Sequence, residues 1–172
     1  MTALAFVMYG LGGATFDPAG GEATFVKRIA ALNININASP YQWTDTQVIA
    51  DAITAAPTDS KIIIGGDSLG ACSTPLIAQS FLGKRTIDYI FAFQPSVYGN
   101  NVGITSNVKT ARCIYNPDFI ETMGLGAEEW WLADGNTVTN LLITDNYDLH
   151  PGDNDPANQD IILVDIRKVL GA

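Results

Sequence analysis

One short segment constrains the fold of this 172-residue chain more than any other. The apolar run Ile62-Ile63-Ile64-Gly65 leads directly into Gly66-Asp67-Ser68-Leu69-Gly70. A continuous apolar run is typical of a strand buried on both faces, and the residues after Ser68 suit a helix. Side chains two positions before and after so sharp a turn collide, and the two glycines remove both collisions. The sequence therefore predicts a tight strand-to-helix turn with Ser68 at its tip.

Apolar strands alternate with amphipathic helices along the rest of the chain. We expect strands over 3–9, 33–38, 61–65, 87–93, 111–115 and 141–144, and helices over about 22–32, 44–56, 68–82 and 156–170. Continuous apolar strands separated by helices favour a mostly parallel sheet covered on both faces. The predicted fold class is a single α/β domain spanning 1–172, a three-layer sandwich with its active site at the carboxyl ends of the strands.

Local signals define two of these helices. Thr44 and Gln47 have the spacing of a capping box for the second helix. Its expected buried stripe comprises Val48, Ile49, Ala52, Ile53 and Ala56. At the last helix, Asp155 and Pro156 form an N-cap and first-position pair, and Gly171 follows its end.

Composition and charge exclude several classes of partner. The chain is 47% hydrophobic and carries a formal net charge of -9, which repels nucleic acid and anionic membranes. Its two cysteines, Cys72 and Cys113, belong to no metal-binding motif, so we expect buried thiols outside any disulfide. The short apolar stretch at 3–9 has no basic segment before it, so we expect neither a signal peptide nor a membrane span, and a cytoplasmic location.

A serine hydroxyl is a poor nucleophile near neutral pH and needs a base within hydrogen-bond reach. His150 is the only histidine, and it lies in a loop after the sixth predicted strand, where it would open at the same sheet edge as Ser68. An acid must orient the imidazole. Asp118 follows the fifth strand and gives the chain order serine, aspartate, histidine, while Asp145 and Asp148 are competitors from the exit of the sixth strand.

Backbone N–H groups would stabilise the negative charge that grows on a substrate carbonyl oxygen. Leu69, directly after the serine, would supply one, and Leu11, in the glycine-rich loop after the first strand, is the expected second donor. The same loop partly matches a dinucleotide-binding turn, but Thr15 stands where that pattern needs glycine and no helix opens there. A purely structural glycine turn is the other alternative.

Together, the glycine loop, the turn at Ser68, Asp118 and His150 before a final helix resemble the α/β-hydrolase family, specifically its small, cap-less lipase and esterase-like members. The resemblance implies a serine esterase with a catalytic triad, no metal and no cofactor, acting on a small-molecule carboxylic ester or thioester. The family usually carries histidine before the serine and before the oxyanion glycine, where this chain has Asp67 and Tyr9.

Aromatic side chains near the predicted site are candidate substrate contacts: Tyr9, Phe119, Trp130 and Trp131. Core packing is the alternative for each.

Two other functional interpretations stay open. Gly66-Asp67-Ser68-Leu69 also spells the signature of the GDSL or SGNH esterases, although that family carries its serine on the first strand and an aspartate where Tyr147 stands here. A non-catalytic α/β-hydrolase-like binding module is the third possibility, because fold alone does not secure activity.

Overall fold

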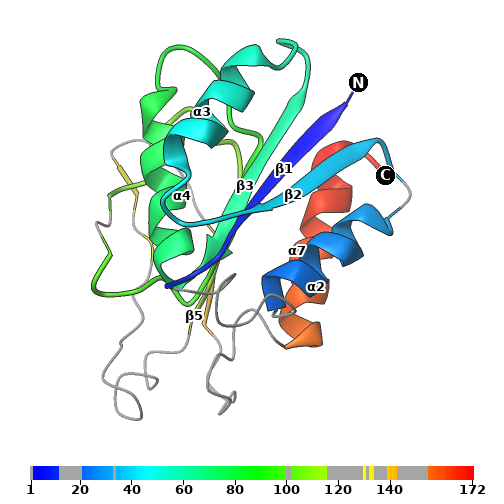
Figure 1. The fold of residues 1–172 in the computed structure, drawn as a ribbon, viewed down its shortest axis with the longest axis vertical. Helices are drawn as coiled ribbons and strands as arrows, with labels where there is room; N and C mark the ends of the chain where they lie inside the picture. Colours follow the sequence, from blue (N-terminus) through cyan, green and yellow to red (C-terminus); the bar gives the residue numbers. More distant parts are fainter. Residues whose placement is uncertain are drawn as a thin grey trace.

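In a computed structural model the chain forms a six-stranded parallel sheet with helices on both faces (Figure 1). The structure describes residues 2–11, 21–32, 34–99, 102–115, 130, 132–133, 139–142 and 155–172. The spatial order of the strands is β2-β1-β3-β4-β5-β6, and all neighbouring pairs are parallel. This architecture confirms the predicted α/β sandwich.

The described residues form ten helices and strands. The strands are β1 (Ala3–Met8), β2 (Ile36–Tyr41), β3 (Lys61–Asp67), β4 (Tyr89–Phe93), β5 (Ala111–Tyr115) and β6 (Thr139–Leu142). The helices are α2 (Gly21–Ala30), α3 (Thr46–Ala55), α4 (Ser68–Ser80) and α7 (Pro156–Leu170).

The sheet separates two hydrophobic cores. On β3, Ile62 and Ile64 point into the core beneath α3 and α4, whereas Ile63 points into the core beneath α2 and α7. Figure 1 shows these two helix pairs on opposite faces of the sheet. Since successive side chains of a strand alternate between faces, a strand covered on both sides must be apolar throughout. The burial of β3 on both faces explains the uninterrupted apolar run that leads into the turn at Ser68.

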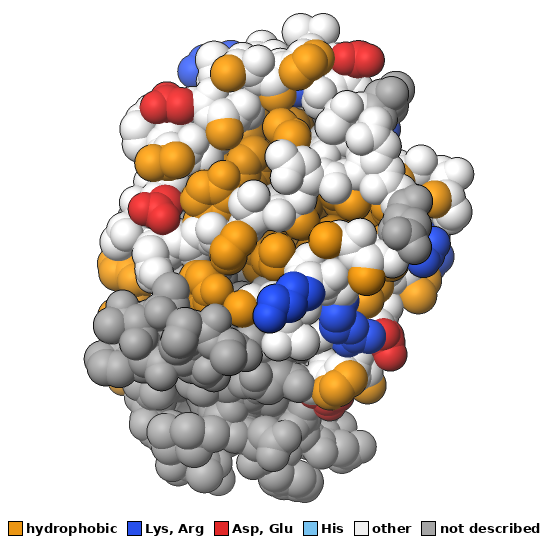
Figure 2. All heavy atoms as spheres, turned by 45° about the vertical axis from the view of Figure 1, so that its right-hand side comes forward, with side chains coloured by type: hydrophobic (Ala, Val, Ile, Leu, Met, Phe, Trp, Pro, Cys, Tyr) orange, Lys and Arg blue, Asp and Glu red, His pale blue; other side chains and the backbone are white. Residues whose placement is uncertain are grey.

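Helix α7 is closed at both ends as the sequence predicts. Asp155 Oδ1 accepts a hydrogen bond of 2.8 Å from the N–H of Ala157, and Gly171 ends the helix at φ 72°. Arg28 of α2 donates to Gln159 Oε1 at 2.7 Å and pairs with Asp160, so it ties the two helices together. On the side where these helices and β2 lie, hydrophobic side chains reach the surface among the charged ones (Figure 2).

The sequence misplaces the second strand. Residues 33–38 were expected to form it, but β2 occupies Ile36–Tyr41 and includes Pro40. Proline has no N–H to donate, which an edge strand tolerates because only one side of it is paired. Pairing with β1, which runs from Ala3 opposite Ile36 to Met8 opposite Tyr41, sets the observed bounds.

The predicted start of α3 is also wrong. The helix begins at Thr46 with Asp45 as its N-cap, so Thr44 and Gln47 do not form a capping box. Asp45 Oδ2 instead accepts the N–H of Gln42 at 2.8 Å, in the turn before the helix. Within the expected stripe, the fully buried residues are Ile49 and Ile53, whereas Val48 is 56% exposed.

The remaining boundaries differ by a few residues. Strand β3 runs two residues beyond its predicted end, to Asp67, and β6 begins two residues before its predicted start. Strand β5 has its predicted bounds. Neither cysteine forms a disulfide, and both thiols are buried.

Candidate active site

Ser68 stands at the point where β3 becomes α4, with a strained backbone. Its φ is 50°, in the left-handed region that non-glycine residues rarely occupy. A Cβ at Gly66 would lie 2.5 Å from the carbonyl oxygen of Met8, and one at Gly70 would lie 2.5 Å from the same atom. Both glycines are therefore required for β1 to pass beside the turn. The predicted tight strand-to-helix turn is present.

The loop that leaves β1 lies directly against the serine. A Cβ at Gly10 would be 3.0 Å from Ser68 Cβ and 3.0 Å from Asp67 Oδ2. Since Met8 pairs with Gly66 in the parallel register, the chain reaches Gly10 at the level of Ser68. The predicted oxyanion donor Leu11 follows at once, with its side chain 74% exposed. The structure thus brings Gly10, the first glycine after β1, and Ser68 together.

The start of α4 supplies the other predicted donor. Leu69 is the second residue of this helix and is half-buried, like Ser68 itself. The first-turn N–H groups of a helix have no partner inside it and carry a partial positive charge. Asp67 makes no side-chain capping hydrogen bond to this turn, which holds no acidic residue. The helix start therefore offers N–H donors beside the serine.

A segment beyond β4 packs beneath the turn at Ser68. Ser96 donates its N–H to the carbonyl oxygen of Ser68 at 3.4 Å. Cys72 Sγ lies 3.3 Å from the carbonyl oxygens of both Ser68 and Ser96. A Cβ at Gly99 would lie 2.1 Å from Cys72 Sγ, so this contact requires glycine. The segment from Ser96 to Gly99 is thereby fixed against the first turn of α4.

Gln94 is the other non-glycine residue with a positive φ in the described part of the chain, at 47°. It directly follows β4, is 5% exposed, and donates its N–H to the carbonyl oxygen of Ile114 at 2.8 Å. Sequence reasoning missed it, because a Gln-Pro pair after an apolar strand is an ordinary loop pattern.

Several predicted site residues lie outside the described residues. These are His150, Asp118, Asp145, Asp148, Phe119 and Trp131. Two other candidate substrate contacts are described, and both are buried: Tyr9 is 5% exposed, and Trp130 is 2% exposed within the core beneath α3 and α4. Their own packing accounts for this burial, and contact with substrate stays a prediction for both.

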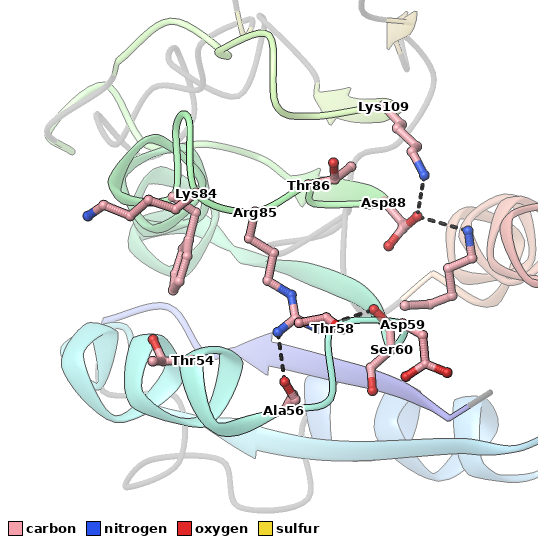
Figure 3. A pocket seen from close by; sticks show the side chains of 12 residues that line it. Thr54, Ala56, Thr58, Asp59, Ser60, Lys84, Arg85, Thr86, Asp88 and Lys109 are labelled. Atoms are coloured by element: carbon pink, nitrogen blue, oxygen red, sulfur yellow. Dashed lines mark hydrogen bonds and ion pairs between the residues drawn. The ribbon is translucent and has the colours of Figure 1, made fainter.

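A cavity of about 580 Å³ lies at the opposite, amino edge of the sheet (Figure 3). Lys61 and Lys109 both donate to Asp88 Oδ1 at 2.9 Å. Burial raises the pKa of Asp88, but these two hydrogen bonds and the N–H of Ile62 outweigh it and hold the pKa below its ordinary value. Arg85 donates to backbone carbonyl oxygens at the end of α3, including that of Ala56 at 2.9 Å.

These charged groups hold the starts of β3 and β4 in place. The length of β3, about 20 Å at the usual rise of a strand, separates the cavity from Ser68. The cavity is therefore not part of the serine site.

The described residues hold no cluster of three or more His, Cys, Asp or Glu side chains able to bind a metal. In the same part of the chain, every helix is too short or too polar to cross a membrane.

Comparison with known proteins supports the fold. No protein-family model matches the chain, and no curated protein matches it. A solved structure from Xanthomonas campestris pv. campestris, described as a candidate hydrolase of the alpha/beta superfamily, matches over 98% of each chain with a TM-score of 0.59. The sequence identity is 13%, so the likeness concerns the fold. The chain therefore has a minimal α/β-hydrolase fold.

Proposed function

We propose that the protein is a serine hydrolase that cleaves a carboxylic ester or thioester of a small molecule through an acyl-enzyme intermediate. The observation that carries the proposal is the strained backbone of Ser68, at φ 50° between a buried strand and a helix. Strain of this kind costs about 1–3 kcal/mol and persists only where the surrounding structure enforces it. Holding a nucleophile at an exposed, sharply turned tip is a reason for a fold to retain it.

In the proposed reaction, Ser68 Oγ attacks the acyl carbon while His150 accepts the serine proton. Negative charge develops on the carbonyl oxygen, where the N–H groups of Leu69 and Leu11 stabilise it. The intermediate collapses as His150 gives its proton to the leaving alcohol or thiol, which leaves the acyl group on Ser68. Water, deprotonated by His150, then releases the acid and restores the serine, while Asp118 orients the imidazolium.

The adjacent glycine loop supports this assignment over a dinucleotide site. Gly10 lies against Ser68, and Thr15 stands where a dinucleotide-binding turn needs glycine. The order of elements also favours an α/β-hydrolase over a GDSL esterase, because Ser68 follows the third strand in the chain.

Covalent labelling tests the proposal. A fluorophosphonate should add one label per chain, detected by intact mass, and Ser68→Ala should take none. A folded wild-type protein that takes no label under conditions that label a known serine esterase would contradict the proposal and favour a binding module. Hydrolysis of a panel of p-nitrophenyl esters and thioesters then defines the acyl and leaving groups.

The base and the acid are tested separately. His150→Ala should abolish ester turnover. Asp118→Asn should reduce kcat by about 10⁴, the loss seen when the orienting acid of a triad is neutralised. If Asp145→Asn or Asp148→Asn causes that loss and Asp118→Asn does not, the acid is assigned to the wrong strand exit.

A further inference from the structure

At the carboxyl edge of the sheet, the residues that follow three neighbouring strands lie side by side: Gly10 after β1, Ser68 after β3 and Gln94 after β4. Strand β1 pairs with β3 so that Met8 lies opposite Gly66, and β3 pairs with β4 so that Asp67 lies opposite Phe93. Continuing both registers places Gly10 and Gln94 on either side of Ser68. The contact between Gly10 and Ser68 Cβ agrees with this register. Gln94 is thus the neighbour of the serine on the side away from the glycine loop.

The backbone of Gln94 is as strained as that of Ser68. The φ angles are 47° and 50°, and no other non-glycine residue in the described ranges has a positive φ. Pro95 adds to the cost at Gln94, because the residue before a proline is driven toward extended conformations. Glycine would occupy the same φ without strain. A glutamine at this position therefore calls for a reason that lies in its side chain.

The surroundings hold Gln94 firmly in this conformation. Its N–H bonds the carbonyl oxygen of Ile114 on β5 at 2.8 Å, and Ser96, two residues further on, bonds the carbonyl oxygen of Ser68. The residue is 5% exposed, so its carboxamide is withdrawn from bulk water. A carboxamide donates and accepts hydrogen bonds without titrating, and withdrawal from water strengthens such bonds.

We infer that Gln94 is a positioning residue of the serine site, whose carboxamide orients the reacting groups around Ser68. The inference rests on the proposed function, since it needs a reactive serine. Strained residues in sparsely populated backbone regions cluster at active sites, and here two of them are register neighbours.

The test separates strain from side-chain chemistry. Gln94→Gly removes the carboxamide and relaxes the backbone, so the rate constant for fluorophosphonate labelling should fall about 10- to 100-fold while the protein stays folded. Gln94→Met keeps the volume and the strain but lacks the carboxamide, so it should label as slowly as Gln94→Gly. Because a carboxamide does not titrate, the pH dependence of labelling should keep its shape in both variants.

Gly83 offers a matched control for the backbone effect. Its φ is 73° and a Cβ there would contact nothing within 4 Å, so Gly83→Ala should lower Tm through backbone strain and leave labelling unchanged.

Two results would overturn the inference: a labelling rate of Gln94→Gly within twofold of wild type, or the same result for Gln94→Met. A wild-type protein that takes no label at all would instead refute the proposed function.

Discussion

Gly70→Ala tests whether the close passage of β1 beside the turn governs the serine site. The added Cβ would lie 2.5 Å from the carbonyl oxygen of Met8 and 2.7 Å from that of Tyr9. Unstrained contact begins near 3.4 Å, so one of the two segments must move by about 0.9 Å. The obstructing atoms are backbone, which cannot rotate away as a flexible side chain would. The segment displaced is the one that leads into Gly10 and Leu11.

Two opposing effects set the change in stability. Overpacking costs about 1–3 kcal/mol. Alanine is favoured over glycine inside a helix by about 1 kcal/mol. The net loss is thus on the order of 1 kcal/mol, and Tm should fall by about 2–4 °C. A misplacement of about 1 Å in catalytic groups costs about 100-fold in rate. The variant should therefore lose far more activity than stability.

The assay pairs thermal unfolding with the rate constant for fluorophosphonate labelling, and Gly83→Ala serves as the control. Alanine at Gly83 costs stability through backbone strain alone, at an open position outside the serine site. Both variants should have a lowered Tm, but only Gly70→Ala should label slowly. Two results would refute the collision. One is labelling of Gly70→Ala at the wild-type rate, and the other is a rise in its Tm that corresponds to the full free-energy preference for alanine over glycine in a helix.

Two buried hydrogen-bonded groups give predictions with a defined pH dependence. The pKa of Asp88 lies below 3.8 in the folded state, so its contribution is present above that pH and is lost as the pH falls through the folded value. Asp88→Asn should lower the free energy of unfolding by about 1–3 kcal/mol at pH 7, and urea titrations should show the difference shrinking below pH 3.8. The phenol of Tyr89 donates to Asp165 Oδ2 at 3.1 Å, and burial, followed by Asp165, raises its pKa well above 10.0. Tyr89→Phe should cost about 1 kcal/mol at neutral pH. Wild type should lose stability as the pH rises above 10.0, whereas the variant should lack this Tyr89-dependent loss.

The sequence predicts the parts of this fold that depend on local patterns. A strand covered on both faces must be apolar over its buried length, so β4 and the Ile62–Gly65 run of β3 stand out in the sequence. Helix α7 carries its own start and stop signals in Asp155 and Gly171. The edge strand β2 is half-buried and contains Pro40, so its bounds depend on pairing with β1, which no local pattern encodes.

The same distinction applies to the site. The turn at Ser68 is predictable because glycines 66 and 70 are needed wherever a strand turns so sharply into a helix. The strained backbone of Gln94 and the contact of Gly99 with Cys72 could not be predicted in this way. Both depend on which strand lies next to β3 and on the register between the strands. Tyr9 is a candidate substrate contact from its place beside the glycine loop, and its 5% exposure leaves both that contact and the alternative of core packing open.

Charged contacts at the amino edge of the sheet help to maintain the backbone strain of Ser68 and Gln94 at its carboxyl edge. At the amino edge, Asp88 is held by two lysines and the N–H of Ile62, and Arg85 bonds carbonyl oxygens at the end of α3. These contacts fix where β3 and β4 begin, and the parallel ladder carries that placement along the strands. Ser68 and Gln94, which directly follow the same two strands, can then be kept in conformations that isolated peptides rarely adopt. The strain at the carboxyl edge is thus tolerated because the free energy that offsets it is spread over the sheet and its amino edge.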